Sequence, residues 1–109
     1  MSLRVQRSVW FLADLEHYAD WYYREANWEL AERYLSSVTT TLAKLADIPT
    51  LGHPAKFQMP ELADFYCVTA VKPFQKHLIF YRFDSVSIYA ERAVHGSRDL
   101  EVQLKSRPE

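Results

Sequence analysis

The chain has 109 residues and lacks several features that mark particular classes of protein. Cys67 is the only cysteine, which excludes an intramolecular disulfide and a cysteine-built zinc site. No apolar stretch approaches the roughly 18 residues needed to cross a membrane, and the N-terminus has no signal-peptide apolar region. We therefore expect a cytoplasmic protein that does not span a membrane.

An excess of basic charge is also absent. The chain has 13 Lys and Arg against 14 Asp and Glu, for a formal net charge of −1. Residues 65–109 hold seven basic against five acidic residues, and residues 1–64 hold six against nine. Proteins that bind nucleic acid usually carry a basic excess that releases phosphate counterions. We therefore do not expect strong direct binding to DNA or RNA.

Apolar and aromatic residues, in contrast, are plentiful. Hydrophobic residues make up 49% of the chain, with three Trp, seven Tyr and six Phe. This composition excludes a disordered chain, and the length suits a single domain over residues 1–109. Several aromatic residues fall in the expected helices and either pack there or form a patch for a partner helix: Trp10, Trp21, Tyr23 and Trp28.

Hydrophobic spacing in the first half predicts a strand followed by two helices. Residues 3–7 alternate apolar and polar side chains, as in a strand. Ser8 and Asn27 are candidate N-caps of two helices, and the second helix should end before Pro49. Because few residues separate the helices, we expect an antiparallel helical hairpin. Residues 49–60 contain three of the five prolines and are predicted to form a loop.

The second half predicts antiparallel strands and a short C-terminal helix. Residues 65–71 form the expected second strand, and a hairpin follows with Asp84 and Ser85 as its turn. This register pairs Tyr81 with Ile88 and Arg82 with Ser87. Gly96 should end the last strand, and Ser97 should cap a helix that reaches residue 104. Two helices against one face of a mostly antiparallel sheet make an α+β fold.

Pleating of this hairpin predicts one core face and one half-polar face that is able to carry a site. The core face is expected to contain Ile79, Tyr81, Phe83, Val86, Ile88 and Ala90. The half-polar face is expected to contain Phe80, Arg82, Ser87, Tyr89 and Glu91.

Four segments in a fixed order carry a family resemblance. They are Asp14-Leu15 in the aromatic first helix, residues 49–54 (PTLGHP), Phe80-Tyr81-Arg82, and residues 92–99 (RAVHGSRD). Together they make the chain, from about residue 3 to residue 104, similar to the ParE toxins of type II toxin–antitoxin modules, within the RelE/ParE superfamily. The resemblance implies an N-terminal strand, a helical hairpin, a three-stranded antiparallel sheet segment and a short C-terminal helix.

The resemblance also implies a function. A ParE-like toxin inhibits DNA gyrase by direct binding, serves plasmid stabilisation or locus maintenance, and needs no cofactor. Its cognate antitoxin would contribute an amphipathic helix and an extended segment that cover the helical hairpin and the sheet edge. Two alternatives remain open: a ribosome-dependent mRNA endonuclease of the RelE type, and a degenerate relative that is no longer toxic.

The candidate site residues follow from these alternatives. In a nuclease, Arg82 would clamp phosphate and His95 would transfer a proton, although Tyr66 and Cys67 stand where the superfamily commonly places Arg. Arg82 and Glu91 are equally consistent with a simple cross-strand ion pair. In a binder, the contact residues would be Arg92, His95, Arg98, Asp99, Trp10 and Trp21. The four histidines lie on different expected elements, so we predict no metal site.

Overall fold

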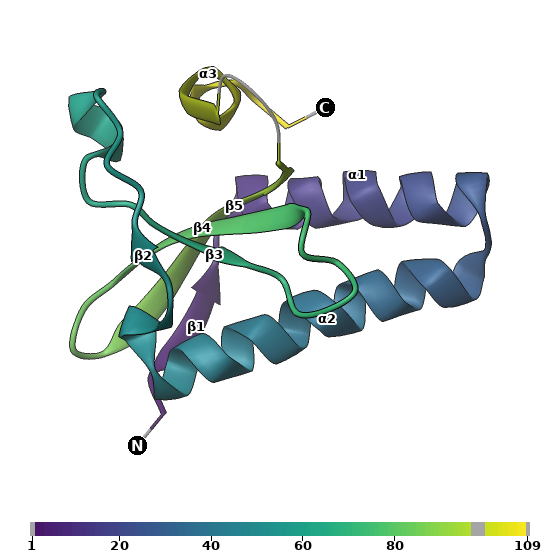
Figure 1. The fold of residues 1–109 in the computed structure, drawn as a ribbon, viewed down its shortest axis with the longest axis horizontal. Coiled ribbons are helices and arrows are strands. Elements are labelled where there is room, and N and C mark those ends of the chain that lie inside the picture. The colour runs from purple at the N-terminus through teal and green to yellow at the C-terminus, as the bar shows by residue number, and fades with distance from the viewer. Residues whose placement is uncertain (1, 97–99, 109) are drawn as a thin grey trace.

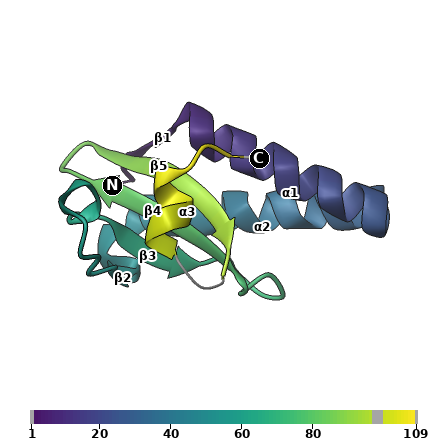
Figure 2. The same ribbon diagram turned by 90° about the horizontal axis from the view of Figure 1, so that it is seen from above.

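The structure is a computed structural model that describes residues 2–96 and 100–108. The chain begins with β1 (Arg4–Arg7), continues through the helices α1 (Val9–Glu25) and α2 (Trp28–Asp47), and then forms β2 (His53–Pro54), β3 (Tyr66–Thr69), β4 (His77–Phe83) and β5 (Ser87–His95) before α3 (Leu100–Lys105). The strands form one sheet in the order β1-β5-β4-β3-β2. The hairpin of α1 and α2 covers one face, α3 lies over the other, and the free end of the hairpin extends beyond the sheet (Figures 1 and 2). The expected α+β fold is confirmed.

Both predicted helix caps are present. The Ser8 hydroxyl accepts a hydrogen bond from the Phe11 amide at 2.9 Å, and the Asn27 side-chain oxygen accepts one from the Leu30 amide at 2.8 Å. These bonds satisfy amides that have no partner within the helix. The Ser8 hydroxyl also donates to the Glu91 carbonyl at 2.8 Å, so the start of α1 is tied to β5. None of the described helices is long and apolar enough to cross a bilayer.

The segment predicted as a loop contains an additional strand, β2, between two short 3₁₀ turns. The Tyr81 hydroxyl holds this segment by donating to the Pro49 carbonyl at 2.7 Å and accepting from the Gly52 amide at 3.1 Å. A Cβ atom on Gly52 would lie 2.5 Å from the Cys67 carbonyl oxygen, so only glycine fits this close approach. The segment therefore pairs with β3 at the sheet edge, which local turn signals did not predict.

The predicted register of the β4–β5 hairpin is wrong by two residues near the turn, and by three beyond an irregularity between Phe80 and Tyr81. Phe83 pairs with Ile88 and Tyr81 with Ala90, because the turn is longer than Asp84-Ser85. The Asp84 carboxylate accepts hydrogen bonds from the amides of Val86 and Ser87, at 2.8 and 2.9 Å, and these bonds lower the pKa of Asp84. A shift of two residues keeps the faces of Ile88 and Ala90, but it moves Val86 into the turn, where it is exposed.

Each face of the sheet buries its own apolar cluster. Tyr81, Ile79 and Ile88 lie under α1 and α2, as predicted for the core face. The opposite face is not the open half-polar surface that the sequence suggested, because Phe80 is buried there under α3 and residues 55–65. Cys67 belongs to this second cluster, as expected for a small core residue, and burial raises the pKa of its thiol to about 11.

Candidate functional site

Asp14 and Arg92 form a buried ion pair between α1 and β5. The Arg92 Nε and Nη2 atoms donate to the two carboxylate oxygens of Asp14 at 2.8 and 3.0 Å, and both side chains are buried. The Ala93 amide donates to the same carboxylate at 2.9 Å. The Arg92 Nη1 atom donates to three carbonyls at the end of α3, those of Gln103, Leu104 and Ser106. Arg92, predicted to contact a partner, thus joins α1, β5 and α3.

Arg82 lies on the exposed surface of β4 and forms the predicted cross-strand ion pair. Its Nε and Nη2 atoms donate to Glu91 Oε2 at 3.0 and 2.7 Å, and its Nη1 atom lies 3.7 Å from an Asp64 carboxylate oxygen. The hydrogen bonds that Arg82 donates to Glu91 raise the pKa of Arg82. Two carboxylates therefore already neutralise this guanidinium, and a phosphate group would have to compete with both.

His95 lies at the other end of the sheet, on the side covered by α1. Its backbone amide donates to the Tyr18 hydroxyl at 3.0 Å, and its ring packs edge-on against His77 at 5.0 Å between centroids. His95 pairs with His77 on β4, five residues before Arg82. The predicted site residues Arg98 and Asp99, and the predicted cap Ser97, lie outside the described residues.

The structure does not bring Arg82 and His95 together. Five residues of extended strand span about 17 Å at roughly 3.3 Å per residue. Strand residues 77 and 82 also point to opposite faces because side chains alternate along a strand. A phosphate clamp and a proton-transfer group must reach the same phosphate, and these two side chains do not meet that requirement.

His77 is buried beneath the hairpin and was not predicted from the sequence. Its Nε2 atom shares a 2.8 Å hydrogen bond with the Tyr22 hydroxyl, and its ring contacts Tyr34 at 4.6 Å between centroids. Burial, with a smaller contribution from His95, lowers the pKa of His77 to about 4. His77 is therefore neutral at physiological pH.

This shift predicts a loss of stability in acid. The imidazole of the unfolded chain takes up a proton near pH 6.5, and that of folded His77 near pH 4, so the unfolded state binds more protons between these values. We expect the free energy of unfolding to fall by up to about 3 kcal/mol as the pH drops through this window. Urea denaturation of the native chain and of His77→Gln at several pH values measures the difference. Equal pH slopes for the two proteins would contradict the prediction.

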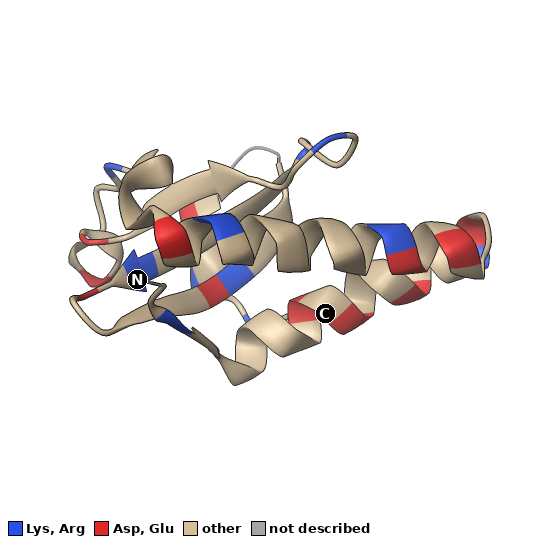
Figure 3. Cartoon of the chain, turned by 90° about the horizontal axis from the view of Figure 1, so that it is seen from below, with Lys and Arg blue, Asp and Glu red and all other residues tan. Residues whose placement is uncertain are grey.

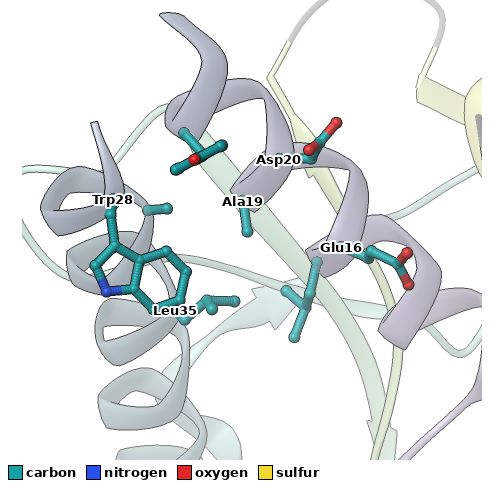
Figure 4. A pocket seen from close by; sticks show the side chains of 8 residues that line it. Glu16, Ala19, Asp20, Trp28 and Leu35 are labelled. Carbon is teal, nitrogen blue, oxygen red and sulfur yellow. The ribbon is translucent and has the colours of Figure 1, made fainter. Parts of the chain in front are cut away.

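A groove lies between α1 and α2 and is lined by side chains of both helices. Its volume is about 670 Å³. Two aromatic side chains lie beside the turn of the hairpin, Tyr23 near the end of α1 and Trp28 at the start of α2. They are 56% and 58% exposed and pack edge to face. Figure 4 shows the Trp28 indole and Leu35 on one side and Ala19 on the other, with the carboxylates of Glu16 and Asp20 directed outward from α1.

The hairpin is an acidic and aromatic surface. Its two helices carry seven Asp or Glu against three Lys or Arg, and acidic residues occur on both helices (Figure 3). Trp10 and Trp21, two of the predicted contact residues, are 38% and 47% exposed. They line other hollows than Tyr23 and Trp28 do, so the four aromatic residues are not one continuous patch. Sequence spacing did not identify Glu16, Asp20 and Leu35 as groove residues, because the facing side chains come from two helices.

The described residues contain no cluster suited to hold a metal ion.

Comparisons with known proteins agree with this geometry. The chromosomal ParDE toxin–antitoxin system from P. aeruginosa contains a chain of the same fold, with a TM-score of 0.70 and 14% identity over 88% of this chain and 98% of that one. The toxin–antitoxin complex RelBE2 from Mycobacterium tuberculosis gives a TM-score of 0.58 and 21% identity over 88% and 100% of the two chains. No curated protein sequence matches. The family described as "ParE toxin of type II toxin-antitoxin system, parDE" matches residues 5–100. The chain therefore belongs to the ParE toxin family of type II toxin–antitoxin systems.

Proposed function

We propose that this ParE-family toxin inhibits DNA gyrase by binding it and carries out no chemistry of its own. The observation that carries this proposal is the separation of Arg82 from His95, about 17 Å along the sheet and on opposite faces. The RelE-type alternative assigned phosphate binding and proton transfer to these two residues. The net charge of −1 supports the same conclusion, since a nuclease needs several cations around the scissile phosphate.

We also propose that a cognate antitoxin neutralises the toxin by laying an amphipathic helix in the groove between α1 and α2. The groove offers apolar side chains at its base, which suits the apolar stripe of a helix. Glu16 and Asp20 at its rim favour Lys or Arg beside that stripe. The solved structures of similar fold are toxin–antitoxin complexes, which supports a protein partner of this kind.

Expression in bacteria without an antitoxin tests the first proposal. We expect growth arrest, filamentous cells, an induced DNA-damage response and covalent gyrase–DNA adducts, because a trapped cleavage complex blocks replication. Rapid loss of translation with cleavage of ribosome-bound mRNA, and no gyrase adducts, would favour the endonuclease instead. Absence of any toxicity from the folded protein would favour a degenerate relative.

A matched pair of variants sharpens this assay. His95→Gln should retain much of the toxicity, because an amide replaces one imidazole hydrogen bond without transferring protons. If His95 were a general acid or base, the same substitution would instead lower the rate by about 10²–10⁴-fold.

Trp28→Ala, in the groove, tests the antitoxin proposal. This variant should remain toxic, and a coexpressed antitoxin should no longer neutralise it. Complete loss of toxicity in a folded His95→Gln protein would contradict the binding mechanism, and full rescue of Trp28→Ala would contradict the groove.

A further inference from the structure

A second hollow lies on the other side of α1 from the antitoxin groove. It encloses about 230 Å³ between α1 and the paired ends of β4 and β5. Successive residues of a helix are rotated by about 100°, which places residues 17, 18, 21 and 22 opposite residues 16, 19, 20 and 23 of the groove. Every described side chain that lines this hollow is aromatic: His17, Tyr18, Trp21, Tyr22, His77 and His95. We call it the aromatic cup.

Several neighbouring rings of the cup meet nearly at right angles, whereas Tyr22 and His77 are tilted at 53°. Tyr18 and His77 have an interplanar angle of 80°, His77 and His95 one of 88°, and Trp21 and Tyr22 one of 73°, each pair 5.0 Å apart between centroids. Rings set at steep angles around one hollow present both edges and faces to it. Those faces carry the negative part of the aromatic quadrupole, which attracts a cation.

Hydrogen bonds hold these rings in place. The Tyr22 hydroxyl is bonded to His77 Nε2 at 2.8 Å, and the Tyr18 hydroxyl accepts from the His95 amide at 3.0 Å. His77 is only 2% exposed, and its Nδ1 atom has no hydrogen-bond partner among the described residues. Side chains that are already ordered lose little conformational entropy when a cation binds, so more of the interaction energy appears as affinity.

The charge of the surroundings favours the same kind of ligand. None of the six described lining residues is Lys or Arg, so no fixed positive charge from them opposes a cation. Over the hairpin as a whole, α1 and α2 carry seven acidic against three basic residues, an excess that attracts cations. Two basic residues, Arg92 and Arg107, line the adjoining hollow that shares His17 and Tyr18 with the cup. An aromatic cup beside acidic helices is the arrangement that recognises ammonium and guanidinium groups.

We propose that the aromatic cup binds an organic cation, an alkylammonium or guanidinium group, through cation–π contacts with Tyr18, Trp21 and Tyr22. This inference is independent of gyrase inhibition and of the antitoxin groove, which uses other side chains. The cation has two possible sources, a free alkylammonium compound or the basic side chain of a bound protein. Both offer the same chemistry to the cup.

Choline and its neutral carbon isostere, 3,3-dimethyl-1-butanol, test the proposal directly. We would titrate each into the native chain and follow backbone amide shifts by NMR, together with a blocked arginine amide as a side-chain probe. Choline should bind saturably in the millimolar range and at least about tenfold more tightly than the isostere, a difference of about 1.4 kcal/mol. No saturable shift for either cation, or equal binding of the isostere, would overturn the proposal.

Two tryptophan variants locate the binding. Trp21→Leu, in the cup, should weaken binding of the tighter cation about tenfold, within the range of a single cation–π contact. Trp28→Leu, in the groove, should bind as the native chain does, and equal losses in both would overturn the assignment to the cup. Tighter binding of the arginine amide identifies a protein side chain as the source, and tighter binding of choline identifies a free alkylammonium compound. Because the readout is ligand binding, failure of the gyrase proposal would leave this result unchanged.

Discussion

Replacing Asp14 by Ala should lower the free energy of unfolding by roughly 3–5 kcal/mol, because it leaves the buried Arg92 guanidinium without its counterion. Both side chains are at most 6% exposed, so water cannot replace the lost carboxylate. The same change removes the acceptor of the Ala93 amide at 2.9 Å. Urea denaturation followed by circular dichroism measures the loss.

The surface ion pairs supply the control. Asp64 lies 3.7 Å from Arg82, with its side chain 70% exposed, and Asp64→Ala should change stability by less than about 1 kcal/mol. Arg92 also binds the carbonyls at the end of α3, so hydrogen exchange in α3 should rise in Asp14→Ala and not in Asp64→Ala. A loss below about 1 kcal/mol in Asp14→Ala would show that the buried pair is not a major contributor to stability.

Tyr81→Ala should destabilise the fold by roughly 3–5 kcal/mol, the usual cost of emptying a buried aromatic site. The ring is fully buried between the sheet and the helical hairpin. Its hydroxyl adds two hydrogen bonds, to the Pro49 carbonyl and from the Gly52 amide. Against a total stability near 5–15 kcal/mol, this loss is enough to unfold a marginal domain. Thermal melting measures it.

Two further variants distinguish the contribution of the Tyr81 ring to stability from that of its hydroxyl. Tyr81→Phe keeps the ring and should cost about 1–3 kcal/mol, because the Pro49 carbonyl and the Gly52 amide lose a buried partner. Tyr89→Ala, on the opposite face of the neighbouring strand, removes a partly exposed tyrosine and should cost less than Tyr81→Ala. A melting temperature for Tyr81→Ala within a few degrees of native would contradict the core assignment.

The helices were predictable because their signals are local. Ser8 and Asn27 accept hydrogen bonds from amides three residues ahead, so the side chain and the helix start are close in the sequence. The face of Tyr81 and Ile88 was also predictable, since alternation along a strand survives any shift of register by two residues. The resemblance to ParE toxins rested on four short segments and is confirmed by the family match over residues 5–100.

The register of the β4–β5 hairpin and the burial and pairing of the candidate site residues were harder to predict from the sequence. Asp84 lengthens the turn through its own side chain, and an irregularity between Phe80 and Tyr81 in the pairing places Arg92 opposite Phe80. Arg92 lies in a stretch of mixed residues that does not reveal its burial. Arg82 paired as expected with Glu91, whereas its distance from His95 became clear only from the pairing of β4 with β5.

By itself the sequence determined the helices, the strands other than β2, the core face of the central hairpin and the toxin family. Each of these depends on residues that are neighbours in the chain or on a fixed order of short segments. The tertiary structure decided which polar residues stabilise the fold by bonding between distant elements. Asp14 and Arg92 are 78 residues apart in sequence, and Tyr81 and Pro49 are 32 apart. Contacts across such separations form only when the helices and the sheet pack together, so no local pattern of residues encodes them.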